Sequence, residues 1–104
     1  MAEAAIEQRL AALGLALPAL PRTPPGARLP FAFVRVCGDR AYVSGHGPIR
    51  HDGTLAAPLG KVGAEVSPDQ AYEAARLTAL GMLTSLKHEL GDLDRIAGWL
   101  RVFG

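Results

Sequence analysis

The sequence has little cysteine, few aromatic residues and no excess of either charge. Its one cysteine, Cys37, excludes an internal disulfide framework and favours a reducing compartment. The 11 basic and 10 acidic residues give a net charge of +1, which provides no electrostatic footprint for duplex nucleic acid or an anionic membrane. No apolar run approaches the roughly 20 residues that a membrane-spanning helix needs.

The composition that remains is typical of one globular domain over residues 1–104. Hydrophobic residues make up 49% of the chain and charged residues 20%. A chain of this length can bury roughly two-thirds of its unfolded surface. Glu3 and Glu7 stand where a signal peptide would have basic and apolar segments, so the sequence predicts a cytoplasmic protein.

The N-terminal part divides into a short helix and a connector. Ile6 and Leu10 share one face of a predicted helix over residues 1–14, and Gly14 supplies its C-terminal stop. Residues 15–30 are rich in proline, which fixes φ and lacks an amide donor. They predict an extended connector on the surface.

Apolar, β-branched and aromatic residues then form two clusters around a turn signal. The segments 31–36 (FAFVRV) and 41–45 (AYVSG) flank Gly38 and Asp39, which predicts a β-hairpin with a tight turn. Cys37 lies in this hairpin with no histidine at a recognised spacing. We interpret it as a small buried hydrophobic residue rather than a nucleophile.

The strongest local pattern predicts a helix over Pro68–Leu90. Ser67 is a typical N-cap, Pro68 suits the first helical position, Gln70 completes a capping box and Gly91 ends the helix. Apolar residues at three- and four-residue steps predict one stripe facing the core. They are Tyr72, Ala75, Ala79, Leu83, Leu86 and Leu90.

The C-terminal segment 95–104, RIAGWLRVFG, predicts one further strand. Its apolar members are Trp99, Leu100, Val102 and Phe103. A hairpin, one long helix and one strand give too few strands to cover that helix. We therefore expect a fold that is interrupted at the end of this chain.

Two histidines and a serine are candidates for metal binding or catalysis. His46 and His51 are five residues apart and Asp52 follows, but a zinc site usually needs a third cluster of ligands. No metal site is expected, and we interpret both histidines as loop residues in contact with solvent. Ser44 lies in VSGHG, where Tyr42 replaces the first glycine of a nucleophile elbow, so a serine hydrolase is not expected.

The segment SGHGP, residues 44–48, has two interpretations. Consecutive amides around Gly45 and Gly47 can converge on one point and bind an anion. The glycines also let a ligand approach the backbone closely. The alternative is a plain corner between a strand and a loop, and composition alone favours that alternative.

The order of these segments resembles the reactive-intermediate deaminase family, also labelled YjgF or endoribonuclease L-PSP, in the branch with an added N-terminal helix. The resemblance covers nearly the whole chain. It is strongest in YVSGHGP before the long helix and LGDLDRI after it. The segments that carry it are IEQRLAALGLALP, VRVCGDRAYVSGHGP, GKVGAEVSPDQAYEAARLTALGMLTSLKHELGDLDRI and LRVFG.

The resemblance implies an α+β, chorismate-mutase-like fold: a mixed sheet with helices packed on one face. It also implies a homotrimer with binding clefts between subunits, and no cofactor. The SGHGP corner then becomes one wall of a cleft, where backbone amides meet a carboxylate. The implied substrate-binding residues are Phe31, Ser44, Gly45, His46 and Gly47.

The activity that the resemblance implies is hydrolysis of enamine or imine intermediates, of the 2-aminoacrylate type, to 2-keto acids. Such a site holds the carboxylate and orients a water molecule. The alternative is a small-metabolite-binding or interaction module without turnover. An endoribonuclease is less favoured, because the chain lacks a basic groove and a general-base pair.

This chain departs from the family pattern at several positions. The family usually has glutamine in place of His46, and deaminating members commonly have tyrosine in place of Phe31. The family continues beyond Gly104 with a helix and two strands, which carry the arginine that binds the substrate carboxylate. Arg101 and Cys37 do not align with the family's arginine and cysteine, so the catalytic residues stay unassigned.

Overall fold

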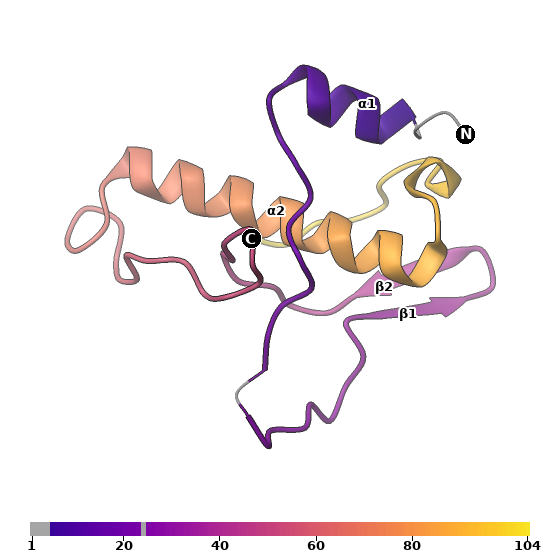
Figure 1. The fold of residues 1–104 in the computed structure, drawn as a ribbon, viewed down its shortest axis with the longest axis horizontal. Coiled ribbons are helices and arrows are strands. Elements are labelled where there is room, and N and C mark those ends of the chain that lie inside the picture. Colours follow the sequence, from indigo (N-terminus) through magenta and orange to yellow (C-terminus); the bar gives the residue numbers. More distant parts are fainter. Residues whose placement is uncertain (1–4, 24) are drawn as a thin grey trace.

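The protein is a small α+β structure in the computed structural model, which describes residues 5–23 and 25–104. Figure 1 shows the long helix beside the hairpin, and the short N-terminal helix on the opposite side of the long helix. The elements in chain order are α1 (Ala5–Ala12), β1 (Val34–Cys37), β2 (Arg40–Val43), α2 (Pro68–Leu90) and the 3-10 turn η1 (Leu93–Arg95). The α+β class predicted from the sequence is confirmed.

Helix α2 has the bounds and caps that the sequence predicts. The Ser67 hydroxyl accepts from the Gln70 amide at 3.2 Å, and the Gln70 side chain accepts from the Ser67 amide at 2.9 Å. Gly91 ends the helix with a φ of 83°, and its amide donates to the Lys87 carbonyl at 2.7 Å. Helix α1 ends as predicted before Gly14, and its predicted beginning lies outside the described residues.

Strands β1 and β2 pair antiparallel as a hairpin around Gly38 and Asp39, as predicted. Cys37 pairs with Arg40 across the turn, and Gly38 has the left-handed φ of 62° that a two-residue hairpin loop favours. The strands are shorter than predicted, because the ladder begins only at Val34.

The core lies where the C-terminal half of α2 meets β1 and η1. Val34, Leu86 and Leu93 have exposed fractions of 5%, 2% and 0% and pack as one cluster. Partly buried residues from the other segments complete it: Ile6, Leu17, Val43, Leu83, Leu90 and Ile96.

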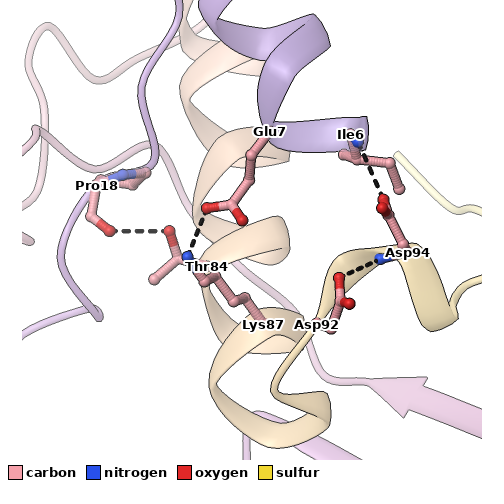
Figure 2. A network of polar contacts seen from close by, with 7 residues as sticks. All are labelled: Ile6, Glu7, Pro18, Thr84, Lys87, Asp92 and Asp94. Atoms are coloured by element: carbon pink, nitrogen blue, oxygen red, sulfur yellow. Dashed lines mark hydrogen bonds and ion pairs between the residues drawn. The ribbon is translucent and has the colours of Figure 1, made fainter. Parts of the chain in front are cut away.

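Helix α1 has no buried residue, and polar contacts add to the packing of Ile6 in attaching it (Figure 2). The Asp94 carboxylate accepts from the Ala5 and Ile6 amides at 2.6 and 3.0 Å, so a residue from η1 satisfies the first donors of α1. Glu7 forms an ion pair with Lys87 of α2. These contacts tie α1 to the end of α2 and to η1.

The proline-rich connector is less exposed than predicted. Pro18 is buried, and its carbonyl accepts from the Thr84 hydroxyl at 2.9 Å (Figure 2). Farther on, the Ala19 amide donates to the His51 carbonyl at 2.8 Å and the Arg22 amide to the Gly53 carbonyl at 2.9 Å. The connector therefore crosses α2 and pairs with a later turn, while Pro24 lies outside the described residues.

The predicted strand at the C-terminus is wrong. Residues 96–104 contain no strand, and η1 occupies the three residues just before them. A strand needs a partner for its backbone groups, and in the described chain the sheet consists of β1 and β2 alone. The apolar side chains of this segment are exposed by 60–83%: Trp99, Leu100, Val102 and Phe103.

The prediction that Cys37 is buried is also wrong. Cys37 is exposed, and only Val34 of β1 is buried. Helix α2 covers the start of this strand, whereas Cys37 lies at the turn end, beyond that cover.

The apolar stripe of α2 is correct only in its C-terminal half. Leu86 is buried and Leu83 and Leu90 are partly buried, but Tyr72, Ala75 and Ala79 are exposed. Periodicity identifies an apolar face without showing whether another segment covers it. The buried residues of α2 are Leu80, Gly81, Ser85 and Leu86.

Gly53 tests the crossing between the connector and the turn. Its φ is +88°, and a Cβ there would lie 2.3 Å from the Leu20 carbonyl oxygen. Gly53→Ala is expected to lower the free energy of unfolding by more than the about 1–2 kcal/mol that a left-handed φ costs an L-residue. Gly26→Ala is the matched control, because Gly26 has a φ of +76° and no atom within 4 Å of a Cβ. Urea denaturation showing equal losses for the two variants would contradict the close crossing.

Candidate functional site

The candidate site is the corner Ser44–Gly47, which directly follows β2. The Ser44 amide donates to the Phe33 carbonyl at 2.9 Å, and the Ser44 hydroxyl donates to the same oxygen at 3.2 Å. The hairpin pairing thus continues one residue beyond the strands. The corner therefore starts from a fixed point at the end of the sheet.

His46 joins this corner to α2. Its Nδ1 lies 2.8 Å from the Ser44 carbonyl oxygen, and its Nε2 lies 2.8 Å from the Ser85 hydroxyl. Its ring packs against Phe33 with the centroids 5.3 Å apart. His46 lies in a loop as predicted but is only partly exposed, with both ring nitrogens in hydrogen bonds, whereas His51 is exposed as predicted.

A glycine in α2 allows this close approach. A Cβ at Gly81 would lie 3.2 Å from Ile49 Cδ1 and 4.0 Å from His46 Cδ2. Ile49 is 5% exposed and follows the corner by two residues. The absence of a side chain at Gly81 thus lets the segment 46–49 lie directly on the helix.

The amides of Gly45 and Gly47 are available to a ligand. Both residues are exposed, and neither amide has an acceptor among the residues that the structure describes. A Cβ at Gly45 would have no atom within 4 Å, and one at Gly47 would meet only Leu55 Cδ1 at 3.7 Å. Backbone donors in open space suit an anion such as a carboxylate.

Phe31 connects to the corner through Phe33. The two rings meet edge to face with centroids 6.1 Å apart, and Phe33 in turn contacts His46. Phe31 itself is half exposed and can contact a ligand. The sequence reasoning missed Phe33, although it lies two residues from Phe31 and so on the same side of an extended segment.

Sequence reasoning also missed Ser85, which bonds to His46. The two residues are 39 positions apart, and a serine inside an amphipathic helix carries no signal of such a contact. Ser85 has an exposed fraction of 3%. No local pattern could have identified it, because the contact exists only after α2 has packed against the corner.

An open apolar hollow adjoins the corner on the side of the α2 N-terminus. It has a volume of about 270 Å³, and Pro48, which directly follows the corner, forms part of its lining. Its remaining lining comes from the loop 58–66 and the first turns of α2: Pro58, Leu59, Gly60, Val62, Val66, Ala71 and Ala74. The hollow offers apolar contact next to the free amides.

Within residues 5–23 and 25–104, no three histidine, cysteine, aspartate or glutamate side chains gather as metal ligands would. In the same ranges, no helix has both the length and the apolar character needed to cross a bilayer.

The turn beyond the corner holds an aspartate with a perturbed pKa. The Asp52 carboxylate accepts from the Thr54 hydroxyl at 2.6 Å and from the Thr54 amide at 3.0 Å. These two hydrogen bonds lower the pKa of Asp52 below its ordinary value of 3.8, and the Arg22 and Arg50 charges add to the effect.

The chain is similar to a crystal structure of the protein Atu1372 from Agrobacterium tumefaciens, a protein with unknown function. The TM-score is 0.67 and the sequence identity is 35% over 85% of this chain. The chain spans about half the length of that structure, 48%. No family model and no curated protein matches the chain. The likeness supports the α+β fold.

Thr54→Val tests the turn around Asp52. Losing the hydroxyl removes the first cause of the lowered pKa, so the pKa of Asp52 should rise toward 3.8. In the parent protein, the lowered pKa means that Asp52 stabilises the turn above pH 3.8 and that this contribution is lost as the pH falls through the lowered pKa. A carboxyl carbon NMR titration measures the pKa of Asp52 in the parent protein and in Thr54→Val, with Thr54→Ser as the control that keeps the hydroxyl. An unchanged midpoint in Thr54→Val would contradict this assignment.

Proposed function

We propose that the Ser44–Gly47 corner binds the carboxylate of small 2-imino or 2-keto acids. The observation that carries the proposal is the pair of exposed amides of Gly45 and Gly47, which have no acceptor within residues 5–23 and 25–104, in a segment that His46 holds against α2. Charge-assisted hydrogen bonds from fixed backbone donors are a general way to hold an oxyanion. Phe31 and the hollow beside Pro48 supply apolar contact for the rest of the ligand.

We further propose that the reaction at this corner is hydrolysis of enamine or imine intermediates of the 2-aminoacrylate type to 2-keto acids, in the cytoplasm. The support is the resemblance of YVSGHGP and LGDLDRI to the reactive-intermediate deaminase family. The finer fold assignment, a chorismate-mutase-like sheet with helices on one face, rests on the same resemblance and on a hairpin followed by a long helix packed on it. A metabolite-binding module without turnover is the alternative.

Assembly into a homotrimer is part of the proposal. Large apolar side chains are exposed after α1 and over the hairpin, the loop 55–62, α2 and the C-terminal segment. Apolar surface that gathers into a patch marks interaction sites. Those exposed by more than half are Leu13, Tyr42, Leu55, Leu59, Val62, Tyr72, Trp99, Leu100, Val102 and Phe103.

Gly45→Val tests the carboxylate site. A side chain at this position blocks close approach to the amides, so binding of pyruvate should be lost. The φ of Gly45 is not left-handed and nothing lies within 4 Å of a Cβ, so the free energy of unfolding should change little. The measurement is a titration with millimolar pyruvate. The amide chemical shifts of Gly45 and Gly47 are monitored in the parent, and thermal shift is measured in the parent and in Gly45→Val. If neither amide of the folded parent responds, the corner is only a turn.

Turnover is tested with freshly generated 2-aminoacrylate. Release of pyruvate above the spontaneous rate, lost in Gly45→Val, supports the enzyme. Pyruvate binding with release at the spontaneous rate supports the metabolite-binding module instead.

The oligomer is tested by light scattering and sedimentation at micromolar concentration. The expected mass is three times the chain mass of 10.9 kDa. A stable, folded monomer would refute the trimer.

A further inference from the structure

Ser85 is the one buried polar side chain among the described residues, and it contacts the proposed binding corner from α2. We infer that Ser85 is a positioning residue: it fixes the tautomer of His46 and, through it, the direction of the Gly45 amide. The identity of the ligand rests on the proposed function, whereas the positioning itself does not.

The two hydrogen bonds of His46 determine its tautomer. The Ser44 carbonyl oxygen can only accept, so the Nδ1 atom at 2.8 Å from it carries the hydrogen. In the neutral ring Nε2 then has a free lone pair, and the Ser85 hydroxyl at 2.8 Å donates to it. Ser85 thus favours the one tautomer that can hold the Ser44 carbonyl.

The peptide group between Ser44 and Gly45 transmits this constraint to the binding face. This peptide is trans, so the Gly45 N–H points opposite to the Ser44 carbonyl. Because the carbonyl is directed at the imidazole, the Gly45 N–H is directed away from it, toward the exposed side. A change of His46 tautomer would release the carbonyl and let this peptide plane turn.

Burial distinguishes this role from that of a nucleophile. A serine hydroxyl donating to a histidine has the geometry of an activated nucleophile. Ser85, however, is 3% exposed and lies beneath His46, so a substrate at the Gly45 amide cannot reach its oxygen. The hydroxyl therefore acts through the imidazole.

The first experiment needs no ligand. Long-range nitrogen–hydrogen NMR of the neutral imidazole should show the hydrogen on Nδ1 in the parent protein. Ser85→Ala should populate the second tautomer and change the Gly45 N–H residual dipolar coupling. Thr78→Ala is the matched control, because that hydroxyl donates to the Ala74 carbonyl within the same helix and should leave both readouts unchanged.

His46→Gln serves as the conservative variant. A glutamine amide can donate to the Ser44 carbonyl and accept from Ser85, so the Gly45 N–H orientation should be kept. Adding Ser85→Ala to His46→Gln should change the Gly45 N–H orientation. Should Ser85→Ala fail to fold, Ser85→Cys keeps the shape with a weaker donor and should shift the tautomer in the same direction.

The second experiment adds pyruvate. Ser85→Ala should raise the Kd for pyruvate by about 2- to 10-fold, the size expected for one hydrogen bond, and Thr78→Ala should not. If pyruvate moves no amide in the parent, the proposed function fails while the ligand-free arm still decides the role of Ser85. A hydrogen on Nε2 in the parent overturns the inference. An unchanged Gly45 N–H coupling in folded Ser85→Ala or Ser85→Cys also overturns it.

Discussion

The packing of Leu93 against Val34 and Leu86 is the contact on which the rest of the arrangement depends. Leu93 is fully buried only two residues after Gly91 ends α2, so the chain must turn back at once onto the hairpin. That turn places Asp94 at the first amides of α1. One small cluster therefore orients the long helix, the first strand and the N-terminal helix together.

The candidate site depends on the same packing through neighbouring residues of α2. Leu86 packs on β1, and Ser85, one position earlier, bonds to His46 beyond the end of β2. The start of one strand and the corner after the other are thus held by the same turn of the helix. A shift of α2 along the hairpin would break both contacts at once, so the direction of the free amides is linked to the core.

The sequence predicted the features whose signals are local. The caps of α2 and the Gly38 turn each depend on a few adjacent residues, and both occur as predicted. The predictions that failed concern the burial of side chains and the pairing of strands. Both depend on segments that are distant in the sequence. The apolar residues from Trp99 onward resemble a strand but have no partner strand among the described residues. Cys37 lies beyond the reach of α2, and no residue of VSGHGP indicates a contact with Ser85.

On the proposed function, the corner alone is expected to bind weakly for a simple energetic reason. Two backbone amides can contribute about 1.5–3 kcal/mol each to a charged acceptor. The loss of translational and rotational freedom costs at least about 4 kcal/mol, so at most about 2 kcal/mol remains, which corresponds to a Kd of tens of millimolar or weaker. Gly45 faces open space, with no atom within 4 Å of where its side chain would be. On the proposed function, tighter binding and choice among acids then require further contacts on the open side of Gly45.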